Sequence, residues 1–181
     1  MRRRYEMNKY NLQDFLQVTL EGCLSTFKET SYDKANQQYL CSDTETKNVF
    51  DFDLYVEKLP VDKTPASPDA IYIGEKQLYF VEFKNQRVSD IENEPMKQKF
   101  RQGTTILKEL LKDFSPKDCK YFFCVVYKSD SSRYSYSKYI ERNSPRFGLA
   151  EENEELGSFY DEIITRDIDF YKQSFKQLNC G

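Results

Sequence analysis

Acidic and basic residues stand on two otherwise apolar runs within residues 67–86. Asp69 precedes the first run, and Glu82 and Lys84 end the second. Charged groups on buried strands are costly unless charged partners compensate them. Two carboxylates can hold a hard divalent cation such as Mg²⁺ or Mn²⁺, which would polarise a phosphate and acidify a bound water. These residue types indicate metal-dependent hydrolysis of a phosphodiester bond.

A β-hairpin would bring these side chains together. Strand-forming residues flank the turn sequence 74–77, which is the pattern of two antiparallel strands. In this hairpin Ile73 lies opposite Leu78. Counting outward from that pair places Asp69 opposite Glu82, and directly opposed residues have Cβ atoms about 4.5–5.5 Å apart.

The second strand of the hairpin should carry the rest of the site. Glu82 and Lys84 share one of its faces, whereas the side chain of Phe83 points to the other. We expect Asp69, Glu82 and the backbone carbonyl of Phe83 to bind the metal. Lys84 would orient the attacking water or neutralise charge in the transition state. The chain contains no histidine, which excludes a histidine general base and histidine-ligated zinc.

The Pro-Asp pair at 68–69, followed by a strand, a turn and the Glu-Phe-Lys triplet at 82–84, resembles the PD-(D/E)xK motif of the restriction-endonuclease-like nuclease superfamily. The resemblance is close over 67–86 and looser elsewhere. It implies an α/β fold with a mixed sheet, whose core runs helix, three antiparallel strands, helix, strand. It also implies an acidic ligand on the first core helix, for which Glu21 is the candidate, although Asp14 could take its place.

Hydrophobic patterns predict the elements that position these residues. Apolar residues at three- and four-residue spacing predict helices over 10–28 and 96–114, and a closing helix over 163–178. Alternation over 47–55 predicts the first strand of the sheet, with acidic residues that face away from the core and one that could line the site. The nearly continuous apolar run 120–127 predicts a central strand that is covered on both faces.

Two later segments have weaker patterns. Residues 129–145 are rich in Ser, Tyr, Lys and Arg, and residues 150–156 are acidic, so we expect loops with short elements in both,. Tyr134, Tyr136 and Tyr139 could stack on unpaired bases, but coverage of the core is the favoured interpretation.

Basic residues that follow the motif predict contacts with nucleic-acid phosphates. They are Arg87, Lys97, Lys99 and Arg101. Lysine and arginine supply most of the affinity for phosphate backbones. The formal net charge of −3 is low for a nucleic-acid binder, but metal-site carboxylates contribute to that sum, and other acidic residues concentrate at 151–162.

Length and composition bound the class of protein. A chain of 181 residues without a Pro/Gly linker predicts a single domain over 1–181,. The cysteine count is five, with no CxxC pair, and the N-terminus lacks an apolar signal core. These features predict reduced cysteines and a cytoplasmic location. No run approaches the roughly 20 apolar residues of a membrane span, so no membrane partner is expected.

Together these features predict a nuclease that uses Mg²⁺ or Mn²⁺, and the superfamily resemblance favours DNA over RNA as its substrate. The main alternative is a non-catalytic module on the same fold that binds nucleic acid or protein. A cap-snatching-type RNA endonuclease is a minor alternative, because some members of that class use a histidine ligand. The sequence leaves open whether the chain acts as a homodimer or with a regulatory protein partner.

Overall fold

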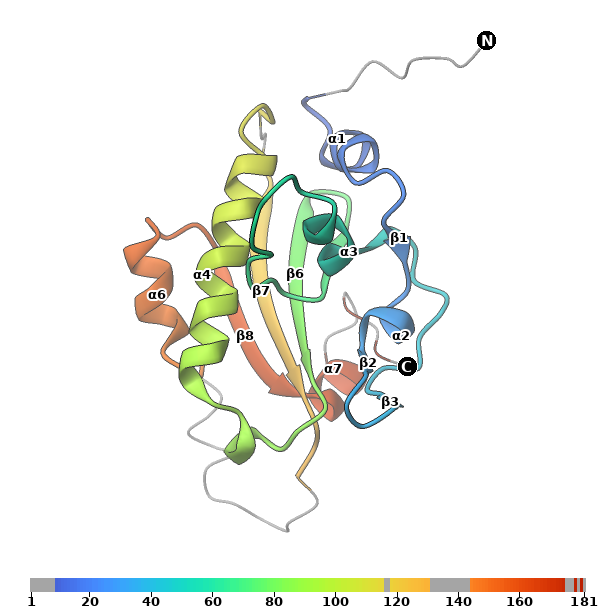
Figure 1. Cartoon of the computed structure of the whole chain (residues 1–181), viewed down its shortest axis with the longest axis vertical. Helices are drawn as coiled ribbons and strands as arrows, with labels where there is room; N and C mark the ends of the chain where they lie inside the picture. Colours follow the sequence, from blue (N-terminus) through green and yellow to red (C-terminus); the bar gives the residue numbers. More distant parts are fainter. Residues whose placement is uncertain (1–8, 116–117, 131–143, 175–177, 179, 181) are drawn as a thin grey trace.

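A mixed six-stranded sheet forms the centre of the computed structural model, which describes residues 9–115, 118–130, 144–174, 178 and 180 (Figure 1). The strands are β1 (Leu24–Ser25), β4 (Val49–Asp51), β5 (Ala70–Ile73), β6 (Gln77–Lys84), β7 (Lys120–Tyr127) and β8 (Glu162–Asp167), in that spatial order. Pairing is antiparallel from β1 to β6 and parallel from β6 to β8. A separate ribbon consists of β2 (Tyr32–Asp33) and β3 (Gln38–Tyr39).

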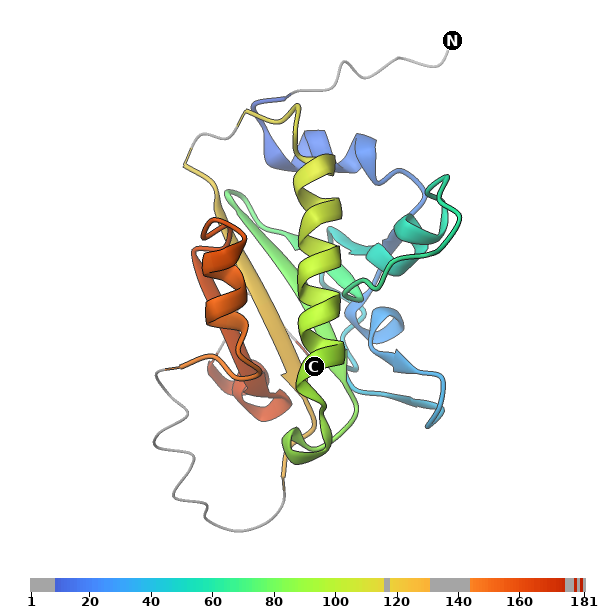
Figure 2. The same cartoon turned by 60° about the vertical axis from the view of Figure 1, so that its left-hand side comes forward.

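Helices cover both faces of this sheet. They are α1 (Leu12–Thr19), α2 (Phe27–Thr30), α3 (Phe52–Glu57), α4 (Asn93–Leu110), α6 (Leu149–Glu155) and α7 (Ile168–Ser174), with a 3₁₀ turn at η1 (Val88–Asp90). Figure 2 shows α4 running along the sheet with α6 beside it. Alternate residues of β6 face opposite ways, so Phe80 packs in the core that includes α4, and Tyr79 packs in the core that includes α2 and α7.

The hairpin has the predicted register. Ile73 pairs with Leu78, and Ala70 pairs with Val81. The Asp69 N–H continues this ladder by donating to the Val81 carbonyl at 3.0 Å. The prediction for the strands that carry the motif is therefore confirmed.

Two other predicted elements are also present. The second helix, expected over 96–114, is α4, which begins and ends a few residues earlier. The run 120–127 forms β7, which lies between β6 and β8 and is buried along most of its length. A long apolar strand in a parallel arrangement is covered on both faces, as this one is.

The single helix predicted over 10–28 is wrong, because local signals divide that segment. The first part, α1, ends at Thr19, and Gly22 has a positive φ of 82°. Glycine adopts this left-handed conformation at little cost, so it ends helices readily. The Thr26 side chain then accepts a hydrogen bond from Glu29 N–H and begins the short helix α2,.

The strand predicted over 47–55 is also shorter than expected. It ends as β4 at Asp51, whose carboxylate accepts a hydrogen bond of 2.8 Å from Leu54 N–H. Aspartate is a favoured N-cap residue, so α3 begins directly after it. Asp53 consequently lies in the first turn of a helix and not on a strand.

The closing helix predicted over 163–178 is wrong in its first part. Residues Glu162–Asp167 form β8, which pairs in parallel with β7, and α7 begins only at Ile168. Ile163, Ile164 and Thr165 are β-branched and favour a strand. The acidic segment 150–156 falls largely within α6, in keeping with the good helix propensity of glutamate,. Tyr134, Tyr136 and Tyr139 lie outside the described residues.

Cysteine pairing differs from the sequence prediction. Cys41 and Cys180 form a disulfide, whereas Cys23, Cys119 and Cys124 remain thiols. The expectation that all the cysteines are reduced is therefore wrong for this pair, and the argument from cysteines for a reducing compartment loses its basis. In the described ranges, no helix combines the length and the apolar character that crossing a bilayer requires.

Candidate functional site

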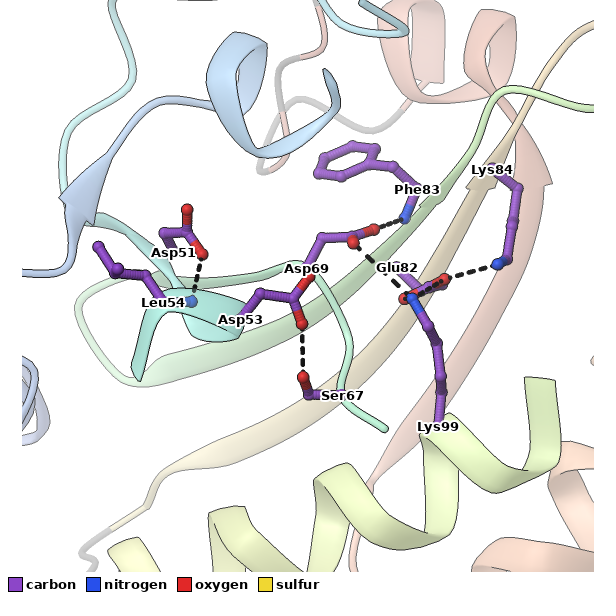
Figure 3. Close-up of polar contacts among 9 residues, drawn as sticks. All are labelled: Asp51, Asp53, Leu54, Ser67, Asp69, Glu82, Phe83, Lys84 and Lys99. Atoms are coloured by element: carbon purple, nitrogen blue, oxygen red, sulfur yellow. Dashed lines mark hydrogen bonds and ion pairs between the residues drawn. The ribbon is translucent and has the colours of Figure 1, made fainter. Parts of the chain in front are cut away.

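Asp69 and Glu82 lie side by side at one end of the hairpin. Asp69 directly precedes β5, and Glu82 lies in the part of β6 that extends past the start of β5. The Asp69 side chain accepts a hydrogen bond of 2.6 Å from Phe83 N–H, so its carboxylate takes the place of a strand partner (Figure 3). Glu82 belongs to β6 and is fully buried. The hairpin thus holds the partly buried carboxylate of Asp69 beside the fully buried carboxylate of Glu82.

Two ammonium groups compensate the buried Glu82. Lys84, two residues along β6, lies 3.0 Å from Glu82 Oε1. Lys99 comes from α4 and donates to both oxygens of Glu82, at 2.8 and 3.0 Å. The Lys99 ammonium also lies 3.8 Å from Asp69 Oδ1. Lys84 contacts Glu82 as predicted, but no ion pair joins it to Asp69 among the described residues. Lys99, expected to contact a nucleic-acid phosphate, lies instead among the carboxylates of the site.

Asp53 is a third acidic residue of this region. Its carboxylate accepts a hydrogen bond from the Ser67 hydroxyl, which precedes the Pro-Asp pair (Figure 3). Burial raises the pKa of Asp53, and the negative charge of Glu82 raises it further, whereas Lys99 and the Ser67 hydrogen bond lower it. The sequence predicted that one acidic residue of 47–55 could line the site, and Asp53 is the residue placed there.

The charges of the site leave an excess of negative potential. Burial raises the pKa of Asp69 well above its ordinary value, and the charge of Glu82 adds to this effect, while Lys99 opposes it. Burial alone would lower the pKa of Lys99, but the carboxylates of Glu82 and Asp69 raise it above the ordinary value. The shift at Lys99 indicates that the carboxylates of Glu82 and Asp69 stabilise a positive charge between them,.

These oxygen donors fit a hard divalent cation. In the described part of the chain, no three or more His, Cys, Asp or Glu side chains are grouped in a way that could hold a metal. Mg²⁺, however, keeps several waters and commonly takes only one or two protein carboxylates. Asp69 and Glu82 supply two, and the carbonyl of Phe83 should lie on the same side as its N–H, which contacts Asp69,. The donor set therefore suits Mg²⁺ or Mn²⁺.

Helix α4 fixes the position of the segment before Asp69. A Cβ atom on Gly103 would lie 3.1 Å from Pro68 Cγ and closer still to Pro68 Cδ. The Gln102 side chain accepts a hydrogen bond of 2.7 Å from Ala66 N–H. The sequence reasoning missed the role of Gly103, although a glycine inside a predicted helix is a recognisable sign of close packing.

The predicted helical ligand lies away from this group. Glu21 follows the end of α1 and is exposed. Among the interactions of the described residues, none joins Glu21 to Asp69 or Glu82. Asp14, the other candidate, lies in the first turn of α1, where its N–H donates to Asn11. Asp53 of α3 is the helical acidic residue that the fold brings to the site.

The other predicted phosphate contacts differ in their surroundings. Arg101 donates to both oxygens of the buried Glu152 of α6, at 3.1 and 3.2 Å. Lys97 lies 3.6 Å from the same carboxylate. Arg87 is exposed at the start of η1. Two of these three side chains therefore link α4 to α6 within the protein.

Comparisons of this chain with protein-family models, with curated proteins and with solved structures found no match.

Proposed function

We propose that this chain is a metal-dependent nuclease with a restriction-endonuclease-like core, and that it hydrolyses phosphodiester bonds of nucleic acid. The observation that carries the proposal is the group formed by Asp69, Glu82 and Lys84 at one end of the hairpin. Its setting supports the same conclusion, because the antiparallel strands β4, β5 and β6 are followed by α4 and the parallel strand β7. This is the core order that the superfamily resemblance implies.

Each residue has a role in the proposed reaction. Asp69 and Glu82, with the Phe83 carbonyl, would hold Mg²⁺ or Mn²⁺. The bound ion would supply a Lewis acid for the phosphate and an acidified water as nucleophile. Lys84 is partly exposed and lies 3.0 Å from Glu82, so its ammonium can reach a phosphate oxygen at the same site. A cation placed there in advance stabilises the charge that develops on the phosphate.

DNA is the substrate that we propose, on the strength of the superfamily resemblance. An RNA substrate, as for a cap-snatching-type endonuclease, would use the same carboxylates. The assay below therefore includes both polymers, and the preferred polymer separates these two hypotheses.

A non-catalytic binding module is the second candidate, and a specific observation favours it. Lys99 already neutralises the carboxylates of Glu82 and Asp69, and Lys97 and Arg101 are engaged by Glu152. A protein whose cations are satisfied internally has fewer of them to offer to phosphates. Metal-dependent cleavage separates the module from the enzyme.

The decisive experiment compares wild type with Glu82→Gln, which keeps the volume of the side chain and removes its charge. Plasmid DNA, single-stranded DNA and RNA are each incubated with Mg²⁺, Mn²⁺ or EDTA. We expect wild type to cleave only with metal, and Glu82→Gln to lose about 100-fold or more in rate, since a metal contributes several kcal/mol to such a transition state.

The matched control is Glu75→Gln, because Glu75 is exposed in the turn at the other end of the same hairpin. Its cleavage rate should equal that of wild type, and circular dichroism should show that both variants are folded. Absence of metal-dependent cleavage of any polymer by wild type would overturn the nuclease proposal. Equal cleavage by Glu82→Gln would overturn the assignment of the site.

A further inference from the structure

The position of the Lys99 ammonium has a consequence for metal binding. We propose that Lys99 is a built-in competitor of the divalent cation: its ammonium holds the Asp69 and Glu82 carboxylates in the metal-free protein and is displaced when the metal binds. This inference rests on the proposed function, because it concerns the same two carboxylates. It differs from that proposal in assigning Lys99 a role in setting metal affinity.

The contacts of Lys99 place its ammonium at the carboxylates that a metal would need. The ammonium lies 2.8 and 3.0 Å from the Glu82 oxygens and 3.8 Å from Asp69 Oδ1 (Figure 3). A Mg²⁺ ion held by both residues would be bonded to oxygens of both carboxylates, so it would occupy the region that the Lys99 ammonium contacts,. The ammonium cannot keep its contacts with both carboxylates while a dication occupies that region, because the two cations would repel each other.

Lys84 does not compete in the same way. Among the ion pairs of the described residues, its ammonium contacts Glu82 and not Asp69, and it comes from the same strand as Glu82. Lys99, by contrast, comes from α4 and is the residue that touches carboxylates of both β6 and the segment before β5. Removal of Lys99 therefore uncovers both metal ligands at once.

Displacement requires only a side-chain movement. The backbone of α4 is held against Pro68 by the close approach of Gly103 and is linked to α6 by Arg101. The Lys99 side chain has four rotatable bonds and is 27% exposed, so rotation of these bonds can move the ammonium away from the carboxylates,. A rigid helix that carries a flexible cation allows exchange with a metal while the fold is kept.

The test measures Mn²⁺ binding directly, by the electron paramagnetic resonance signal of free Mn²⁺ titrated with metal-free protein at fixed ionic strength. Wild type is compared with Lys99→Met, which keeps the apolar length of the side chain and removes the charge. We expect Lys99→Met to bind Mn²⁺ about tenfold more tightly or better. Adding Asp69→Asn to Lys99→Met should remove this tight binding.

The matched control is Lys108→Met, the same change on the same helix, because the Lys108 ammonium contacts the Leu156 carbonyl and not the site. Its Mn²⁺ affinity should equal that of wild type. The Met variant loses both the charge and the hydrogen bond of Lys99 and could unfold for that reason. Lys99→Gln is therefore tested in parallel, because its amide removes the charge but can still donate to Glu82. Thermal unfolding of each protein establishes that the measured species is folded.

The outcomes separate this inference from the proposed function. If wild type binds Mn²⁺ and cleaves nucleic acid, but the Lys99 variants bind no more tightly, the inference is overturned and the nuclease proposal stands. If neither wild type nor any Lys99 variant binds Mn²⁺, both are overturned. Tighter binding by both Lys99 variants, lost with Asp69→Asn, supports the inference even if no polymer is cleaved and the nuclease proposal is overturned.

Discussion

The Asp69 carboxylate is held in a position that opposes its own ionisation. It is partly buried beside Glu82, and its pKa is raised first by this burial and then by the neighbouring negative charge. A group whose pKa is raised on folding stabilises the folded protein in its protonated form. An ionised carboxylate at this position therefore costs stability. Groups with strongly shifted pKa values concentrate at functional sites, where function requires that cost.

We expect Asp69→Asn to stabilise the metal-free protein at neutral pH. The folded-state pKa of Asp69 lies above the unfolded value of about 3.9. The stabilisation that Asp69 gives the wild-type fold is therefore complete below about pH 4, and it is lost as the pH rises through the folded-state pKa. Asparagine can still accept the Phe83 hydrogen bond and does not ionise. The gain should be about 1–3 kcal/mol in the free energy of unfolding at pH 7 and near zero at pH 4.

Urea unfolding at several pH values, with EDTA present, measures this gain. Asp62→Asn serves as the control, because Asp62 is exposed and should give no pH-dependent difference. A destabilised Asp69→Asn protein at pH 7, or a difference that does not change with pH, would contradict the electrostatic account of the site.

The positions of residues whose neighbours lie on the same hairpin could be predicted from the sequence. Alternation along a strand and the count across the turn placed Asp69, Glu82 and Lys84, because both depend only on local geometry. The partners of Lys99 and the place of Asp53 depend on how α4 and α3 pack against the sheet. Sequence spacing carries no information about that packing, so Lys99 was assigned to an external phosphate and not to Glu82.

At the scale of elements, one glycine determines how closely α4 approaches the site. Gly103 is buried, and a Cβ there would meet the Pro68 ring and would lie 3.3 Å from the Phe80 ring. The residue next to Pro68 is Asp69, the proposed metal ligand. The contact therefore connects helix packing with the position of the Asp69 carboxylate.

Gly103→Ala is expected to displace Pro68 and with it Asp69. Alanine favours a helix over glycine by up to about 1 kcal/mol, but an added methyl in a packed core costs about 1–3 kcal/mol. We expect a net loss of about 1 kcal/mol in the free energy of unfolding and a loss of Mn²⁺ affinity. Urea unfolding and the Mn²⁺ titration measure the two effects.

Thr105→Ala is the matched control, because Thr105 is exposed on the same helix. It should be neutral or slightly stabilising, since alanine is the better helix former, and it should leave Mn²⁺ affinity unchanged. A Gly103→Ala protein that is more stable than wild type and binds Mn²⁺ normally would show that the contact with Pro68 does not position Asp69.

The elements that the sequence misassigned share a cause. Ile164, Ile168 and Tyr171 are spaced as on a helix, but parallel pairing with β7 draws residues 162–167 into the sheet. A short apolar run fits either structure, and tertiary pairing decides between them. The cause is different for the segment 10–28. Gly22 and Thr26 are helix-ending and helix-capping residues, and both are recognisable in the sequence.

For the whole molecule, the segment that follows α1 packs against the C-terminal part of the described chain on the face of the sheet opposite the site. Phe27 of α2 and Tyr171 of α7 belong to one hydrophobic core there, together with Cys41 and Cys180. Glu82 and Lys84 lie on the other face of β6, with Leu78 and Phe80. The Cys41–Cys180 disulfide and the proposed site thus lie on opposite faces of the sheet.

The disulfide should therefore affect stability without affecting chemistry. Cys41 and Cys180 are buried and 139 residues apart in sequence, so their bond restricts a large part of the unfolded chain. Loss of a disulfide commonly costs about 2–5 kcal/mol. We expect Cys180→Ser to lower the free energy of unfolding by this amount, while metal-dependent cleavage at temperatures well below unfolding keeps its rate.

Thiol titration checks the pairing itself. The unreduced, denatured chain should show three reactive thiols, and reduction should raise this to the five cysteines of the sequence. Cys119→Ser, a change outside the disulfide, should have a much smaller effect on stability than Cys180→Ser. Five reactive thiols before reduction would exclude the disulfide and restore the argument for a reducing compartment. Loss of cleavage by folded Cys180→Ser would instead show that the two faces of the sheet are coupled.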